Sequence, residues 1–175
     1  MIPFPYYRRF SFLFSLLLLL SGFLTAGCGI YTFQDVSIPA EVKTIKLNFI
    51  ENKASYVNPQ LSPRLTDRLQ QKIISQTRLN RTNQDDADWV VTGFISEYRV
   101  VTSGISGQQA STNRLSIAVK LVLKDNITQK SNNIDVNKAF EFSATKSLQQ
   151  AEGELTEDII RGLSDEIFNR LFSNW

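Results

Sequence analysis

Cys28 is the only cysteine of the chain, and it lies where an apolar leader gives way to a polar sequence. A pair of arginines (8–9) and a run of almost only Phe and Leu (10–20) precede it, which is typical of a secretory signal peptide. Ala26 and Gly27 supply the small residues that a lipoprotein signal peptidase needs before the cut, and the Cys28 thiol can carry a diacylglycerol. We therefore predict that residues 1–27 are removed and that Cys28 is the lipidation site.

Two other interpretations of this segment stay open. Cys28 would be a small buried hydrophobe if it lay in a core, but its place at the leader junction argues against that. Residues 10–24 approach the lower limit for a membrane-spanning helix, so an uncleaved anchor is the second alternative. A single cysteine also excludes an intramolecular disulfide and a site with several thiolate ligands.

The composition restricts the chemistry of the mature chain. Removing residues 1–27 reduces the 19 basic residues to 17, equal to the 17 acidic residues, so no charge excess points to nucleic-acid binding. The chain holds no histidine, which excludes an imidazole base and an imidazole metal ligand. No glycine-rich phosphate loop is present, and the acidic residues at 152–158 fit a helix N-terminus better than proton transfer. We predict a protein that is not an enzyme and has no cofactor and no metal.

Hydrophobic periodicity predicts the elements that must position any binding surface. Alternation predicts strands over residues 43–50, 113–124 and 136–143, and a fourth, less regular one over residues 89–102. Apolar residues at 61, 65, 69 and 73 predict one helix of about four turns that begins at Pro63, and a second stripe predicts another helix from residue 147 to near the C-terminus. The order of these elements predicts an α+β fold, a four-stranded mixed sheet with two helices packed on one face. Residues 41–175 would form this single domain, after a lipidated linker over residues 28–40.

Two segments between the last three strands are predicted to be polar hairpin tips, over residues 103–112 and 125–133. Loops of this kind are not needed by the core and often make partner contacts. The partner-contact candidates are Ser103, Gly104, Ile105, Gly107 and Gln108 in the first tip, and Trp175 at the C-terminus.

Several stretches of the mature chain, taken in order, resemble the lipopolysaccharide-assembly lipoprotein family LptE. They are Cys28-Gly-Ile-Tyr-Thr-Phe, Phe49-Ile-Glu-Asn-Lys-Ala, Gly93-Phe-Ile-Ser-Glu-Tyr-Arg-Val, Asn113-Arg-Leu-Ser-Ile and the closing Ile167-Phe-Asn-Arg-Leu-Phe-Ser-Asn-Trp. The chain looks like a member of a divergent branch of this family. The resemblance implies two helices on a four-stranded sheet, and a lipoprotein that plugs the translocon barrel LptD and helps lipopolysaccharide reach the outer leaflet.

The resulting hypothesis is an outer-membrane lipoprotein facing the periplasm, with an LptD-like β-barrel, lipopolysaccharide and the membrane as partners. Lipopolysaccharide-contact candidates are Arg99, Arg114 and Lys120, basic residues on neighbouring predicted strands that no family motif selects. The alternative is a periplasmic accessory lipoprotein of an ABC lipid transporter or an activator of a cell-wall synthase, because fold does not separate these roles. An enzyme is a third, weaker option.

Overall fold

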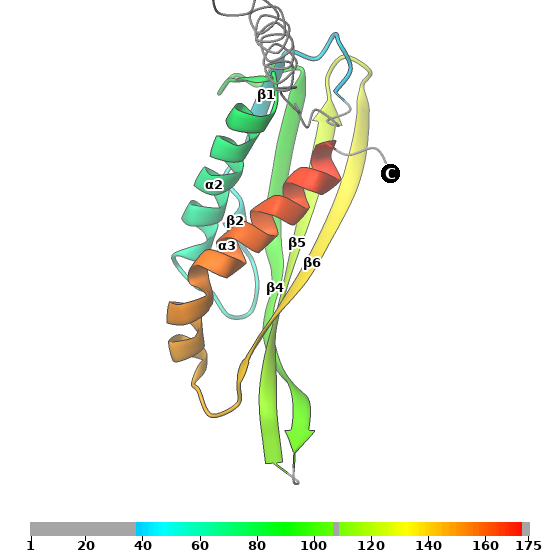
Figure 1. Cartoon of the computed structure of the whole chain (residues 1–175). Coiled ribbons are helices and arrows are strands. Elements are labelled where there is room, and N and C mark those ends of the chain that lie inside the picture. Colours follow the sequence, from blue (N-terminus) through cyan, green and yellow to red (C-terminus); the bar gives the residue numbers. More distant parts are fainter. Residues whose placement is uncertain (1–37, 107–108, 173–175) are drawn as a thin grey trace, which may run out of the picture. The chain divides into compact units, whose positions relative to one another are not determined.

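A mixed sheet of six strands, with two helices on one face, makes up the computed structural model, which describes residues 38–106 and 109–172 (Figure 1). The strands are β1 (Thr44–Leu47), β2 (Glu51–Asn52), β3 (Asn80–Arg81), β4 (Trp89–Ser106), β5 (Gln109–Asp125) and β6 (Lys130–Ser143). The helices are α2 (Leu61–Gln76) and α3 (Leu148–Phe172). The sheet order is β3-β1-β4-β5-β6, and β2 also pairs with β4.

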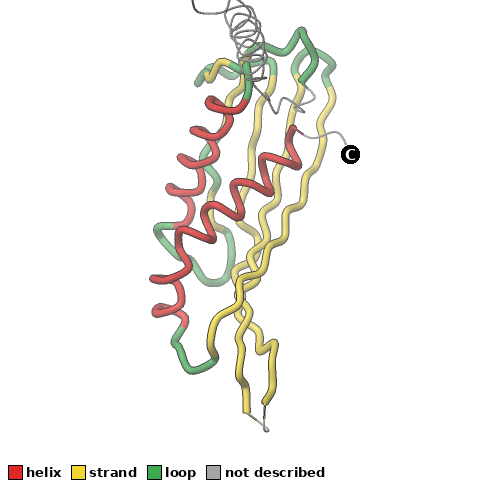
Figure 2. Tube along the Cα trace, in the orientation of Figure 1, coloured by secondary structure: helices red, strands yellow, loops and turns green. Residues whose placement is uncertain are grey.

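The predicted α+β architecture is confirmed, but the predicted number of strands is wrong. The sheet is mixed because β1 and β2 pair with β4 in parallel, whereas β4, β5 and β6 pair antiparallel. Both helices lie on the same face of the sheet (Figure 2). The additional strands, β2 and β3, are two residues each, which is too short for any alternation of apolar and polar residues to show in the sequence.

The first predicted strand is interrupted after Leu47. The alternation predicts that Phe49 shares the inner face with Ile45 and Leu47, but Phe49 is 55% exposed and Ile50 is 0% exposed. The break between β1 and β2 shifts the inward side by one residue, since a strand alternates its faces with a period of two. The Ile50 amide then donates to Thr66 Oγ1 on α2, which ties this irregular segment to the first helix.

A β-bulge explains the imperfect alternation of β4. Ile95 pairs with Val119, Tyr98 pairs with Ile117, and the two residues between them face Ala118 alone. The extra residue changes which face the following side chains occupy. As a result, Ile95 before the bulge and Tyr98 after it both lie in the core.

The core lies between the inner face of the sheet and the apolar stripes of the helices. On β5 the predicted alternation holds without interruption, because Leu115, Ile117, Val119, Leu121 and Leu123 are all buried. The predicted stripe of α2 is buried as well, and so is the C-terminal half of the predicted stripe of α3. The start of α3 is fixed by a capping box in which Ser147 Oγ accepts from the Gln150 amide and Gln150 Oε1 accepts from the Ser147 amide.

Candidate partner-binding surface

The β4–β5 hairpin extends beyond the rest of the sheet. The last residue of β6, Ser143, pairs with Thr112, so the hairpin has only two strands past that point. There β4 and β5 continue to pair through Gly104 with Thr112 and Ile105 with Ala110 (Figure 1). The end of the hairpin also projects beyond both helices (Figure 2). A two-stranded ribbon without a covering layer is only marginally stable by itself, so it gains from contact with a partner.

The prediction of a loop over residues 103–112 is wrong, because β4 continues to Ser106 and β5 begins at Gln109. The small, uncharged residues of this segment look like a loop in sequence, but cross-strand pairing keeps them extended. The second tip is also shorter than predicted, since β5 ends at Asp125 and β6 begins at Lys130. Both strands of the first hairpin therefore extend further toward its tip than predicted.

The structure places some of the predicted contact residues on this ribbon. Ser103 and Gly104 lie in β4, where the Ser103 hydroxyl lies 3.4 Å from the Thr112 carbonyl oxygen, and Ile105 lies in the same strand. Gly107, Gln108 and Trp175, like Cys28, lie outside the described residues.

The projecting ribbon carries no charge. No residue from Val100 to Asn113 is acidic or basic, and the side chains are mainly small or hydroxylated. Val100 and Val101 are partly exposed at its base. A surface of this kind can be buried against a polar partner without leaving an unpaired charge.

The three basic candidates share the face of the sheet that no helix covers. Arg99 pairs in register with Ser116, and Arg114 pairs with Val101, so the two arginines are diagonal neighbours on β4 and β5. Lys120 lies opposite Phe94, roughly 20 Å further along β5 at about 3.4 Å per residue. The structure therefore brings Arg99 and Arg114 together and leaves Lys120 apart.

Carboxylates neutralise both arginines. Arg99 Nε donates to Glu97 Oε1 at 2.9 Å, and Arg114 Nη2 donates to Glu141 Oε1 at 2.9 Å. Lys120 faces Asp135 across the β5–β6 ladder without a close ion pair among the described residues. The helix-free face consequently has balanced charge and no strong positive field.

A cluster around Glu152 was not predicted from the sequence. Its carboxylate accepts from Tyr98 Oη at 2.5 Å, from Tyr56 Oη at 3.1 Å and from Asn58 Nδ2 at 3.0 Å. The two tyrosine rings stack with centroids 5.3 Å apart. Burial, followed by the hydrogen bond to Glu152, raises the pKa of Tyr98 well above its usual range. This Glu152 cluster joins the start of α3 to β4 at the point where the hairpin leaves the core.

Asp88 accepts a set of hydrogen bonds that the sequence did not indicate. Its Oδ2 accepts from the Lys43 amide at 2.8 Å and from the Thr44 amide and hydroxyl at 2.9 Å each. These hydrogen bonds, the Lys43 amide first, hold the pKa of Asp88 below its ordinary value of 3.8. One carboxylate thus fixes the start of β1 beside the start of β4.

Acid should weaken this link. A carboxyl group whose pKa is lower in the folded state stabilises the fold above its unfolded pKa, and the stabilisation is lost as pH falls through the folded pKa. We expect Asp88→Asn to cost about 1 kcal/mol at pH 7 and to reduce the loss of stability between about pH 5 and pH 2. Denaturant unfolding across this pH range measures both effects. Asp86→Asn, a nearby exposed carboxylate, is the control and should leave the acid dependence unchanged.

Within residues 38–106 and 109–172, no three His, Cys, Asp or Glu side chains are grouped so that they could hold a metal ion. No helix in this part of the chain is both long and apolar enough to cross a membrane.

The fold defines the class of the protein as a small α+β domain in which two helices cover one face of a mixed sheet. The family follows from a direct match: residues 42–171 fit the model of the LptE family, described as lipopolysaccharide-assembly, and the chain belongs to this family. A search of curated protein sequences finds no match.

Solved structures similar to this chain include several lipoproteins. A minor lipoprotein from Acinetobacter baumannii is 17% identical with a TM-score of 0.49, and the match covers 74% of this chain and 91% of that one. A hypothetical protein from Chlamydia trachomatis is 10% identical with a TM-score of 0.48, covering 74% and 98%. The rare lipoprotein B from Shewanella oneidensis is 10% identical with a TM-score of 0.41, covering 72% and 89%. The family assignment rests on the family match rather than on these similarities.

Proposed function

We propose that this chain is an outer-membrane lipoprotein that plugs and supports the lipopolysaccharide translocon barrel, an LptD-like protein. In this proposal residues 1–27 are removed, Cys28 carries the lipid anchor, and the domain faces the periplasm without catalysing a reaction. Membership of the lipopolysaccharide-assembly family supports a role in lipopolysaccharide transport and assembly. The leader and the small residues before Cys28 support the anchor.

The projecting β4–β5 hairpin is the observation that carries the plug proposal. The interior of an outer-membrane barrel is polar and often filled with water, so an inserted element must be polar without being strongly charged. The ribbon between Val100 and Asn113 has this composition. Its two strands reach beyond β6 and the helices, so they can enter a barrel while the core remains outside.

The face of the sheet that no helix covers is the second part of the proposed partner-binding surface, beside the projecting β4–β5 hairpin. Its arginines are neutralised by Glu97 and Glu141, which makes close approach to a barrel wall less costly than bare charges would. Arg99, Arg114 and Lys120 remain the proposed lipopolysaccharide contacts. Lys120 is the strongest of them, because the two arginines must first give up a carboxylate partner.

Photocrosslinking in cells tests the proposal. We expect a photoreactive residue at Ile105 or Gln108 to form adducts with a large outer-membrane β-barrel. The control position is Asn83, which lies in an exposed loop between β3 and β4. Adducts only with an inner-membrane transporter or a cell-wall synthase would instead support the accessory-lipoprotein alternative.

A charged insertion at the hairpin tip should prevent assembly without unfolding the domain. We expect four alternating Lys and Glu residues between Gly107 and Gln108 to lower the yield of barrel complex about tenfold or more, because unpaired charges are costly to bury. The free energy of unfolding should change by less than about 0.5 kcal/mol, since tips tolerate insertion. Co-purification and denaturant unfolding measure the two effects.

Two controls separate charge from length and position. A Gly-Ser insertion of equal length at the same site should leave more complex than the charged one. The charged insertion placed after Thr128, in the β5–β6 turn, should leave assembly intact. Equal yields from all three insertions would contradict a hairpin that enters the barrel.

A further inference from the structure

Glu152 is the one carboxylate of α3 that has no cationic partner in the part of the chain that the structure describes. The helix carries six acidic residues, and the other five each form an ion pair with a lysine or an arginine. These five pairs are Glu154–Lys146, Glu157–Arg64, Asp158–Arg161, Asp165–Lys72 and Glu166–Arg170. Glu152 accepts hydrogen bonds only from neutral groups, those of Tyr56, Tyr98 and Asn58. Its negative charge is therefore left without a counter-ion.

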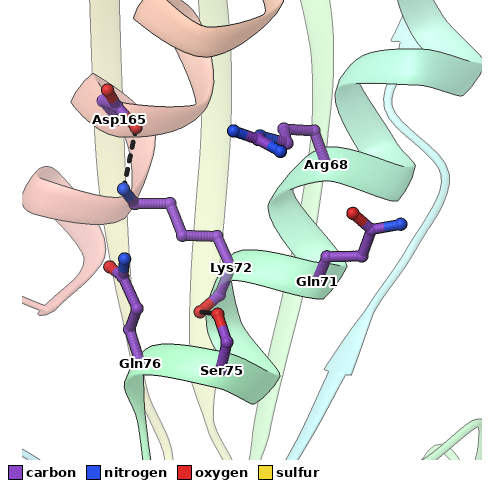
Figure 3. A pocket seen from close by; sticks show the side chains of 6 residues that line it. All are labelled: Arg68, Gln71, Lys72, Ser75, Gln76 and Asp165. Carbon is purple, nitrogen blue, oxygen red and sulfur yellow. Dashed lines mark hydrogen bonds and ion pairs between the residues drawn. The ribbon is translucent and has the colours of Figure 1, made fainter.

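A completed pair is visible in the cleft between α2 and α3. There Lys72 Nζ of α2 donates to Asp165 Oδ1 of α3 at 2.7 Å (Figure 3). Three of the five paired carboxylates lie on exposed residues, where water already screens the charge, whereas Glu152 is half-buried. A half-buried carboxylate is screened less by water, so it gains more from a cation than an exposed carboxylate does.

A pocket of about 280 Å³ opens beside Glu152, between the starts of the two helices. Its lining includes one carboxylate, three amides, one hydroxyl and a glycine, from Glu152, Asn58, Gln60, Gln149, Thr156 and Gly153. None of the lining residues, all within the described part of the chain, is a lysine or an arginine. A Cβ added at Gly153 would meet no atom within 4 Å, so the space beside this residue is open. The pocket thus combines an uncompensated negative charge with room for a side chain from outside.

The free acceptor positions in the pocket favour an ammonium group. Glu152 Oε1 accepts from Tyr98 and Asn58, whereas Oε2 accepts only from Tyr56, so one acceptor position remains on Oε2. A guanidinium binds a carboxylate best through two parallel hydrogen bonds, which need both oxygens. An ammonium has three separate donors, which can reach Oε2 and the amide oxygens of the lining one by one.

The pocket lies at the end of the domain from which the β4–β5 hairpin projects. Both helices begin at this end (Figure 1). Tyr98, which donates to Glu152 at 2.5 Å, precedes Val100 at the base of the uncharged ribbon by two residues of β4. A partner that encloses the ribbon therefore comes close to the pocket.

We propose that this Glu152 pocket binds the ammonium group of a lysine from the partner that receives the β4–β5 hairpin. The lysine supplies the counter-ion that Glu152 lacks, and a charge pair across the interface fixes how the partner is oriented around the hairpin. The inference rests on the proposed role of the hairpin as the element that enters a partner.

Titration with n-butylammonium, which has the four-carbon chain and the ammonium group of a lysine side chain, tests the pocket by itself. The probe is added to the isotope-labelled full-length chain in detergent, and NMR follows the Gly153 backbone amide and the Asn58 side-chain amide. We expect saturable shifts with n-butylammonium and none with uncharged n-butanol. Glu152→Gln should weaken binding about tenfold or more, because the charge is lost. Glu154→Gln removes a carboxylate that pairs with Lys146 and should leave binding unchanged.

A second variant closes the pocket and keeps the carboxylate. Gly153→Leu places a side chain in the open space, so it should prevent n-butylammonium binding. It should not lower Tm, because leucine favours a helix more than glycine does. This variant keeps the test decisive if Glu152→Gln fails to fold. Equal shifts in the wild type and in Gly153→Leu, or no shift in the wild type, would overturn the proposal.

Crosslinking in cells tests the partner and separates this inference from the hairpin proposal. A photoreactive residue at Gln60, whose side chain forms no cap hydrogen bond, should form adducts with the same protein that Ile105 reaches. Gly153→Leu should lower the yield of that complex about tenfold or more. If Ile105 forms adducts but Gly153→Leu leaves the yield unchanged, the lysine contact does not exist and the hairpin proposal stands. If Ile105 forms no adducts, the hairpin proposal fails, and this inference fails with it.

Discussion

Replacing Leu163 with Ala should lower the free energy of unfolding by about 2–5 kcal/mol, the cost typical of deleting a fully buried leucine side chain. Leu163 is 0% exposed at the middle of α3. It belongs to the same core as Ile117 and Val119 of β5, so the truncation leaves a cavity between the helix and the sheet. Denaturant unfolding followed by circular dichroism measures the loss.

Asn169→Ala is the matched control, because Asn169 is an exposed residue of the same helix. It should change the free energy of unfolding by less than about 0.5 kcal/mol. If Leu163→Ala also stayed within that range, the stripe of α3 would face solvent and the two-layer arrangement would be wrong.

The elements that the sequence predicted well are those whose burial is uniform along their length. The α2 stripe and the β5 alternation each persist over many residues, and one period dominates each segment. Errors arose where the period changes within an element. The break after Leu47 exposes Phe49, and the bulge in β4 shifts the inward face between Ile95 and Tyr98. Such shifts depend on the neighbouring strand, which the sequence of one strand does not specify.

Composition located the candidate partner-binding surface at residues 103–112, but it predicted a loop where the structure has paired strands. The small polar residues between Ser103 and Thr112 are typical of loops, and propensity alone favours that interpretation. Pairing between β4 and β5 overrides the propensity, because each strand satisfies the backbone of the other as far as Ser106 and Gln109. The helix-free position of Arg114 and Lys120 followed from the regular alternation of β5, whereas Arg99 lies on that face because the bulge shifts the alternation of β4. The carboxylate partners of the two arginines did not follow from the sequence, since Glu97 and Glu141 become neighbours only through the bulge and the β5–β6 register.

Contacts between distant segments were beyond sequence reasoning altogether. Glu152 lies among other acidic residues near the start of α3, and in the sequence it looks like a residue that serves the helix dipole. In the structure it accepts hydrogen bonds from residues 54, 94 and 96 positions away. None of these pairs leaves a periodic signal, so only the assembled fold brings them together.

Removing the Glu152 carboxylate is the second large perturbation that we expect. Glu152→Ala should lower the free energy of unfolding by about 2–4 kcal/mol, because hydrogen bonds to a charged group contribute about 1.5–3 kcal/mol and a buried donor would be left unpaired. Tyr98 is only 5% exposed, so water cannot replace the lost acceptor fully. Glu154→Ala removes a carboxylate that pairs with Lys146 at the surface, and this control should cost at most about 1 kcal/mol.

The same variant should change the response to alkali. A tyrosine whose pKa is raised by folding stabilises the protein below its unfolded pKa of 10.0, and that stabilisation is lost as pH rises from this value through the folded pKa. Burial is the largest cause of the raised pKa of Tyr98, and the Glu152 hydrogen bond and charge add to it. We therefore expect wild-type stability to fall above about pH 10, and to fall less steeply in Glu152→Ala. Parallel alkaline slopes for the two proteins would show that Glu152 does not control the ionisation of Tyr98.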